Sequence, residues 1–333
     1  LNYPATSNRI SSVTVGTPTG TAVRTFTHDG AGNITQDVRT GSGTYNYTMN
    51  QRNRLATARV GTTQVGSYVY DALERLAIRT TSNVSPAGTT HFAYDLSGKV
   101  LIEANGANGA TVREYIWFDD MPLAIVANVD TASPQLLHVH ADHLDRPIML
   151  TNGSKANVWE AVYRPFGEVH AITGTATQNL RFPGQYFLFE TGLAHNWHRT
   201  YDATIGRYLQ ADPLGLVHRK TMALTSLDPI QGPLASLNLD GPSLYSYTRS
   251  QPLTRTDRTG LLSTSANEII RRFTQKDGSM FCQANARENA AHCTRLYELC
   301  IMRMWNTAPH ARCDSCLRKC IAQGEWEFEE CWP

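Results

Sequence analysis

The chain has 333 residues and a formal net charge of +1 at pH 7, so it lacks the basic field that would attract nucleic acid. Hydrophobic residues make up 41% of it, which is enough for a core, and no apolar run approaches the ~20 residues of a membrane span. No motif indicates a cofactor. All seven cysteines lie at or beyond Cys282, so two regions of different character meet before that residue.

Residues 1–130 are rich in Thr, Val, Tyr, Gly and Asn, and show little helical periodicity. β-branched and aromatic residues alternate with polar ones, and clusters of Gly, Asn and Asp interrupt them at short intervals. This composition predicts many short antiparallel strands joined by tight turns. We therefore expect a strip of antiparallel β-sheet over residues 1–130.

A repeated pattern within this region predicts one hairpin per repeat. It consists of an aromatic residue, a second aromatic or His two positions on, an Asp or other polar residue, a turn residue and an aliphatic. The two aromatics share one face of a strand, the Asp can bond turn amides, and Gly or Asn accepts the positive φ of a turn. The pattern occurs at residues 26–34, 45–55, 68–76 and 92–100.

The pattern resembles the YD repeat of the RHS family, and Tyr70-Asp71 and Tyr94-Asp95 match it best. In that family such hairpins build a long strip of sheet that spirals into a hollow shell, so the resemblance implies part of an RHS shell. Four or five hairpins are too few to enclose a folded domain, so either further repeats lie upstream or this copy is a truncated remnant. The alternative is a generic antiparallel β domain with tyrosine-rich strands.

A series of motifs over residues 138–216 extends the resemblance. Their order and spacing closely resemble the RHS repeat-associated core region, which implies a core or plug domain over residues 131–261. The matching segments are residues 138–147, 163–168, 180–186, 190–193, 201–202, 206–209 and 212–216.

Two aspartates in this region are candidate catalytic residues by the same resemblance. In the RHS family, two Asp-Pro-x-Gly motifs bracket a short segment, and the core cuts its own backbone just after the second. The first motif begins here at Asp212, and the second at Asp257, where Arg258 stands in place of the usual proline. The resemblance implies an intramolecular aspartyl autoprotease that uses this pair and cuts the bond between Leu261 and Leu262.

Elementary chemistry is consistent with that role. Two nearby carboxylates cannot both ionise cheaply, so one can activate a water while the other donates a proton. Asp228 begins a broken copy of the first motif and is a rival for the role of Asp212. The alternative reading is that these aspartates merely begin turns.

Histidines offer a second candidate site. His138 and His140 would share one face of a strand, and with His143 they could bind a metal ion. The alternative is that they make turn and interior hydrogen bonds within the core motif, and we prefer it. His195 and His198 are interpreted in the same way.

Residues 262–333 have a different character, with apolar residues and cysteines at helical spacing. We expect a small α-helical, cysteine-rich domain held by disulfides, since a segment this short needs staples. The disulfide candidates are Cys282, Cys293, Cys300, Cys313, Cys316, Cys320 and Cys331. The alternative is a zinc site built from Cys313, Cys316, Cys320 and His310.

The resulting functional hypothesis is an RHS-type polymorphic toxin, secreted or on the cell surface. Its shell would enclose its own C-terminal tail as cargo and release it by self-cleavage, with an immunity protein and a secretion apparatus as partners. The alternative is a cell-surface interaction or structural protein with an uncleaved tail. Within the tail, no recognised catalytic motif frames His292, Glu298 and His310.

Overall fold

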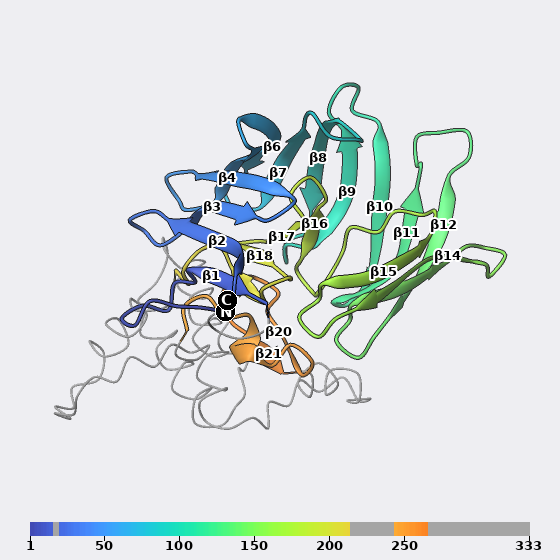
Figure 1. The fold of residues 1–333 in the computed structure, drawn as a ribbon. Coiled ribbons are helices and arrows are strands. Elements are labelled where there is room, and N and C mark those ends of the chain that lie inside the picture. Colours follow the sequence, from blue (N-terminus) through green and yellow to red (C-terminus); the bar gives the residue numbers. More distant parts are fainter. Residues whose placement is uncertain (16–19, 214–242, 266–333) are drawn as a thin grey trace, which may run out of the picture. The chain divides into compact units, whose positions relative to one another are not determined.

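The computed structural model describes residues 1–15, 20–213 and 243–265. Its largest element is an antiparallel sheet of fifteen strands, hydrogen-bonded in sequence order (Figure 1). We call it the repeat sheet. Its strands are β1 Ser12–Thr14, β2 Ala22–His28, β3 Ile34–Arg39, β4 Gly43–Met49, β5 Leu55–Val60, β6 Thr63–Tyr70, β7 Leu76–Thr81, β8 Gly88–Tyr94, β9 Val100–Asn105, β10 Thr111–Phe118, β11 Met121–Ala127, β12 Gln135–Ala141, β13 Pro147–Thr151, β14 Asn157–Tyr163 and β15 Val169–Gly174.

Residues 178–213 and 243–265 form a second region, which we call the core module. It holds a four-stranded and a two-stranded antiparallel sheet. Its elements are β16 Tyr186–Leu188, β17 Leu193–Asn196, β18 Arg199–Asp202, β19 Arg207–Tyr208, the 3-10 helix η1 Thr248–Ser250, β20 Arg255–Thr256 and β21 Thr264–Ser265. Among the described residues, no helix is long and apolar enough to cross a membrane.

The prediction of a mainly antiparallel β fold is confirmed. The four repeated stretches each lie on one hairpin, namely β2–β3, β4–β5, β6–β7 and β8–β9. The same sheet continues through β12 to β15, so residues 135–174 share it with the predicted strip. The predicted helical, cysteine-rich domain lies outside the described residues from residue 266 onward.

In four of the repeats, the polar residue closes its turn by two local hydrogen bonds. The Oδ1 atom of Asp71 accepts from the backbone amides of Leu73 and Arg75, both at 2.9 Å. This side chain therefore satisfies two amides that the turn would leave unpaired. The same bonds, to the amides two and four residues on, are made by Asn50, Asp95 and Asp142, and also by Asn152 in the β13–β14 turn.

The second aromatic of a repeat ties it to the preceding repeat. The hydroxyl of Tyr70 donates to the carbonyl of Leu55 at 2.8 Å, and that of Tyr94 donates to the carbonyl of Leu76 at 2.7 Å. In the next hairpin, the indole nitrogen of Trp117 takes the same place. A polar tip on an apolar ring thus explains why tyrosine suits this position.

A β-bulge recurs at that position in seven hairpins, from β2–β3 to β14–β15. In each of these pairs of strands the register shifts by one residue immediately before the second aromatic position. The residues that follow the shift lie 21 to 24 positions apart, and are His28, Met49, Tyr70, Tyr94, Trp117, Ala141 and Tyr163. The bulge therefore marks the repeat even where its aromatic residues have been replaced.

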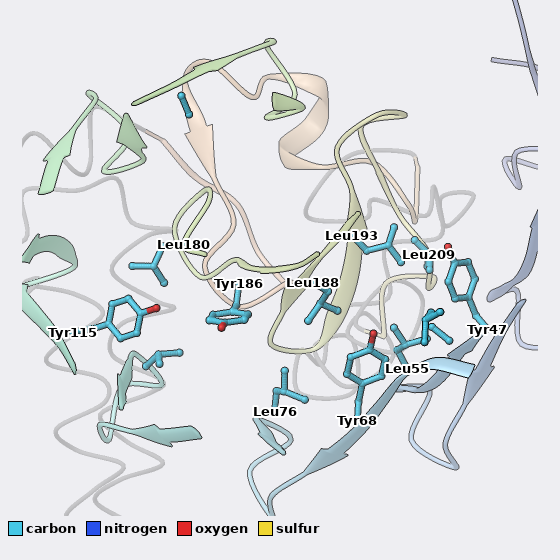
Figure 2. Close-up of a cluster of buried hydrophobic side chains, with 14 of the residues drawn as sticks. Tyr47, Leu55, Tyr68, Leu76, Tyr115, Leu180, Tyr186, Leu188, Leu193 and Leu209 are labelled. Carbon is cyan, nitrogen blue, oxygen red and sulfur yellow. The ribbon is translucent and has the colours of Figure 1, made fainter. Parts of the chain in front are cut away.

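The core lies between the repeat sheet and the core module (Figure 2). Leu55 and Leu76 from the repeat sheet, and Leu188, Leu193 and Leu209 from the core module, are each about 1% exposed. Burying a leucine side chain contributes about 1.5–3 kcal/mol, so this contact is a principal link between the two regions.

Buried polar contacts join the same two regions. Tyr68 of β6 donates to Glu190 at 2.7 Å, and Tyr186 of β16 donates to Glu103 of β9 at 2.9 Å. Burial raises the pKa of Glu190, although Arg79 and the Tyr68 hydrogen bond act in the opposite direction. These contacts fix how β16 and the turn after it sit on the repeat sheet.

Candidate active site

In the structure, Asp212 and Asp257 both pair with the guanidinium group of Arg199. Arg199, in β18, places its Nη2 atom 3.3 Å from Oδ2 of Asp212 and 3.2 Å from Oδ2 of Asp257. All three side chains are at most 2% exposed. The two carboxylates therefore lie close together in a site screened from water, and the guanidinium offsets the repulsion between them.

Asp257 also organises the segment that carries the predicted scissile bond. Its Oδ1 atom accepts from the amides of Gly260 and Leu261, at 2.8 and 3.1 Å. Its Oδ2 atom accepts from the hydroxyl of Tyr208 at 2.7 Å, and its backbone carbonyl accepts from Asn196 at 2.9 Å. Both oxygens of the carboxylate are thus held, and the chain turns around them just before the Leu261–Leu262 bond.

Arg199 has further contacts with the same segment. Its Nε atom donates to the carbonyl of Gly260 at 2.5 Å, and Nη1 donates to the carbonyl of Leu244 at 3.3 Å. The guanidinium also lies over the ring of Tyr208, 3.7 Å from its centroid. A buried guanidinium is costly unless it is paired, and here charge, hydrogen bonds and an aromatic face all partner it.

An aromatic cluster surrounds the site on one side. Tyr201, Tyr208 and Tyr247 are completely buried and pack with Phe182, with ring centroids 4.6 Å apart for Tyr201 and Tyr247. Burial raises the pKa of Tyr208 well above its ordinary value, and the nearby charge of Asp257 acts in the same direction. The Tyr208 phenol therefore stays protonated, which is the form that donates to Asp257.

Gly260 is required by the backbone at this point. Its φ is +72°, and a Cβ atom would lie 2.4 Å from the carbonyl oxygen of Asn196. Both the left-handed conformation and the close approach exclude a side chain. The segment can therefore pass directly beneath β17 and β18.

Arg258, which stands where the family has a proline, pairs with a different set of residues. Its guanidinium lies 3.1 Å from Oδ2 of Asp145 and 3.3 Å from Oδ2 of Asp120. These aspartates lie in the β12–β13 and β10–β11 turns of the repeat sheet. Asp257 and Arg258 thus attach consecutive residues to two different parts of the fold.

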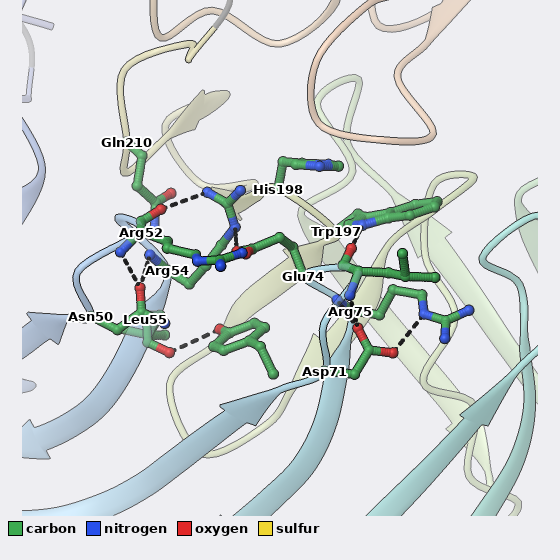
Figure 3. A network of polar contacts seen from close by, with 12 residues as sticks. Asn50, Arg52, Arg54, Leu55, Asp71, Glu74, Arg75, Trp197, His198 and Gln210 are labelled. Atoms are coloured by element: carbon green, nitrogen blue, oxygen red, sulfur yellow. Dashed lines mark hydrogen bonds and ion pairs between the residues drawn. The ribbon is translucent and has the colours of Figure 1, made fainter. Parts of the chain in front are cut away.

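His198 and Trp197 support the segment from the β17–β18 turn. Both the backbone amide and Nδ1 of His198 lie 3.1 Å from the carbonyl oxygen of Thr259. The neighbouring Trp197 donates to the carbonyl of Leu73 at 2.9 Å, in the β6–β7 turn of the repeat sheet (Figure 3). In Figure 3 the ion pairs of Glu74 with Arg52 and Arg54 lie beside this contact.

His138, His140 and His143 do not form a metal site. His138 and His140 lie in β12, and Nε2 of His140 is 2.9 Å from Oγ1 of Thr151. His143 lies after this strand, with Nε2 2.8 Å from the carbonyl oxygen of Leu253. Among the described residues, no group of three or more His, Cys, Asp or Glu is arranged to hold a metal ion.

His195 is a core residue. It is buried against the ring of Tyr70, with centroids 5.8 Å apart, and burial lowers its pKa to about 3. The remaining candidates from the sequence lie outside the described residues. They are Asp228, His292, Glu298, His310 and the cysteines Cys282, Cys293, Cys300, Cys313, Cys316, Cys320 and Cys331.

Sequence reasoning missed Arg199, Tyr208 and Asn196. Each belongs to the resembling core region, but none stands in a motif with chemistry of its own. No signal in the sequence marked Arg199, since the residues that become β17 and β18 are mostly polar. Its partners are 13 and 58 residues away in sequence, so local spacing could not identify them.

Sequence comparisons relate the chain to bacterial toxins. Over 249 residues it is 28% identical to the Double-stranded DNA deaminase toxin A of Burkholderia cenocepacia, which covers 57% of this chain and 17% of that protein. Over 151 residues it is 27% identical to Toxin protein Tse5 of Pseudomonas aeruginosa, which covers 45% of this chain and 10% of that protein. The chain thus spans a small part of the length of either relative.

Among solved structures, the Photorhabdus luminescens Tc holotoxin pore matches with a TM-score of 0.48 and 18% identity, over 72% of this chain and 13% of that one. The structure of TcdB2-TccC3 matches with a TM-score of 0.47 and 17% identity, over 72% of this chain and 14% of that one. No protein-family model matches the chain. The chain is therefore similar to toxin proteins, and its relatives are much longer than the part that it matches.

Proposed function

We propose that the chain belongs to an RHS-type toxin that cuts its own backbone between Leu261 and Leu262 and releases the residues beyond as an effector. The observation that carries the proposal is the buried Asp212–Arg199–Asp257 cluster. Asp257 binds the amide of Leu261 itself, so a carboxylate is tied to the residue whose carbonyl would be attacked.

The reaction would be a hydrolysis within one chain. One carboxylate removes a proton from a water molecule, and the water oxygen attacks the Leu261 carbonyl carbon. The bond from that carbon to the Leu262 nitrogen breaks, and the nitrogen takes a proton from the second carboxyl group. The products are a carboxylate at Leu261 and an amine at Leu262. Because the bond is part of the same chain, no translational freedom is lost in bringing it to the carboxylates.

The burial of the site suits a single-turnover reaction. Arg199 and the tyrosines exclude bulk solvent and hold the segment in one conformation. Leu262 is 44% exposed, so the new amino terminus can leave the site once the bond is cut. We propose that the released residues act as a toxin, with an immunity protein and a secretion apparatus as partners, outside the producing cell or at its surface.

The proposal is tested by expressing the full chain and separating the products on a denaturing gel. Wild type should yield two fragments, and sequencing the smaller should begin at Leu262. Asp257→Asn and Asp212→Asn should each leave one band. A single wild-type band, or cleavage unchanged in Asp257→Asn, contradicts the proposal.

Two further variants make the test specific. Asp37→Asn removes another buried carboxylate, which pairs with Arg24 and Arg39 in the repeat sheet, and should cleave as wild type does. Asp228→Asn tests the rival aspartate. If Asp228→Asn abolishes cleavage while Asp212→Asn still cleaves, the catalytic role belongs to Asp228 and not to Asp212. If every chain stays intact, the alternative function as an uncleaved surface interaction or structural protein is favoured.

A further inference from the structure

Residues 257–261 are attached to both regions of the fold. Asp257 holds them to Arg199, the carbonyl of Thr259 accepts from His198, and the guanidinium of Arg258 reaches Asp145 and Asp120. The first two attachments come from the core module. Arg258 supplies a direct ion-pair connection from this segment to turns of the repeat sheet.

The two aspartates that pair with Arg258 each face one terminal nitrogen of its guanidinium. Asp145 is 6% exposed and Asp120 is 22% exposed, and Nη2 and Nη1 of the guanidinium each meet one of them. Nη1 also lies 3.4 Å from the carbonyl oxygen of Asp120. A planar guanidinium with two donors in fixed geometry therefore sets an orientation as well as a distance.

The side chain of Arg258 borders a cavity, so packing does not enclose it on every side. Arg258 forms part of the wall of a cavity of about 90 Å³, together with Asp120, Asp145 and Thr259. The backbone, by contrast, is tightly packed: a Cβ atom at Gly184 would lie 1.9 Å from the carbonyl oxygen of Arg258. The main chain is thus confined, while the side chain is held mainly by charge.

Asp212 is followed by Pro213, whose ring fixes the backbone φ, whereas Asp257 is followed by Arg258. We infer that Arg258 is a positioning residue, whose ion pairs with Asp145 and Asp120 hold residues 257–261 in the conformation that self-cleavage requires. This inference rests on the proposed self-cleavage. It also identifies the turns of β10–β11 and β12–β13 as parts of the cleavage machinery.

The first test measures cleavage rate in full-length chains made by cell-free translation and followed over time on a denaturing gel. Arg258→Met keeps much of the side-chain volume but removes the charge, and a misplacement of this kind should slow cleavage by up to about a hundredfold. Arg258→Lys keeps the charge but loses the planar guanidinium, and should recover only part of the rate. Asp145→Asn should slow cleavage as well. Arg258→Met cleaving as fast as Arg258→Lys would overturn the inference.

Arg75→Gln is the matched control. Arg75 also lines the cavity and forms an ion pair, but with Asp71 of its own turn. Its replacement should leave the cleavage rate unchanged. An equal loss of rate in Arg75→Gln would show that any arginine of the cavity wall matters, and would refute a specific role for Arg258.

A second measurement is independent of cleavage. In chains that carry Asp212→Asn and stay uncut, hydrogen exchange is followed in peptides that contain the amides of Gly260 and Leu261. Adding Arg258→Met should accelerate their exchange, and adding Arg75→Gln should not. If wild type does not cleave but this acceleration appears, the proposed function fails and the positioning role stands. If exchange is unchanged, the positioning role is wrong.

Discussion

The repeat sheet and the core module hold their polar side chains in opposite ways. In the repeat sheet, a turn aspartate such as Asp71 bonds amides two and four residues away. In the core module, Arg199, Asp257 and Tyr208 join residues 49 to 58 positions apart. Local bonds close each turn within its own hairpin, whereas the long-range network exists only when several segments have assembled. We expect substitutions to have local effects in the first region and coupled effects in the second.

The largest expected effect is that of Arg199→Met. It leaves two buried carboxylates without their cation, and removing one partner of a buried pair typically costs about 3–5 kcal/mol. The matched change in the repeat sheet, Arg75→Met, breaks a partly exposed pair worth about 1 kcal/mol or less. Urea unfolding of the full chain followed by circular dichroism measures both. Equal losses would remove the contrast between the two regions.

Tyr208→Phe should have the next largest effect. The hydroxyl donates to Asp257 and accepts from Asn196, so its loss leaves two buried polar groups short of a partner, at about 1–3 kcal/mol. In a double-mutant cycle with Asn196→Ala, the coupling energy should be about 0.5 kcal/mol or more. Tyr94→Phe removes one hydrogen bond in the repeat sheet and should cost about 1 kcal/mol. Additive losses for Tyr208 and Asn196 would argue against a coupled network.

A smaller effect is expected from Asp71→Ala. The turn amides of Leu73 and Arg75 lose their acceptor but can bind water in its place, so the cost should be about 1 kcal/mol. Asp71→Asn keeps the Oδ1 acceptor and should be closer to wild type. Hydrogen exchange should show the disturbance confined to the β6–β7 turn, and a disturbance that reached β18 would contradict the local character of the hairpins.

The smallest effects concern pH, and here the two regions should differ in sign. Burial raises the pKa of Glu190, so its contribution to stability is complete below the ordinary pKa near 4.5 and is lost as pH rises through the folded value. Glu190→Gln should therefore raise the melting temperature near pH 7 relative to pH 4, since an acceptor for Tyr68 remains.

Asp71 should behave in the opposite way. Burial alone would raise its pKa, but hydrogen bonds from the backbone and side chain of Arg75 hold it below its usual range. Its contribution is present above the ordinary value near 3.8 and is lost as pH falls through the folded value. Asp71→Asn should thus lower the melting temperature at neutral pH and match wild type in acid. The same sign for both variants would contradict these assignments.

The hairpins could be predicted because their determinants are local. Tyr70-Asp71 and Tyr94-Asp95 show within a few residues the strand, the bulge position and the turn. The later repeats were harder to recognise, because Trp117 is followed by Phe118 and Tyr163 by Arg164 in place of an aspartate. The recurring bulge reveals them, and a bulge has no sequence signature of its own.

The site could be predicted only in part. The resemblance indicated Asp212 and Asp257, and the structure places both on Arg199. The guanidinium could not be inferred, since it became a partner only when β18 packed between the two segments. Arg258 was interpreted only as a lost proline. Its partners Asp120 and Asp145 lie more than 100 residues earlier in the chain, so the sequence did not indicate them.

The recurring bulge has a consequence for how such a chain can change in evolution. Each repeat carries two strands and a bulge at the same position, so duplication or loss of a whole unit of 21 to 24 residues restores the same alternation of inward and outward side chains. Insertion of a single residue within a strand would instead exchange the two faces. Recombination between equivalent bulges therefore offers a route by which genes for this sheet can lengthen or shorten while its interior stays apolar.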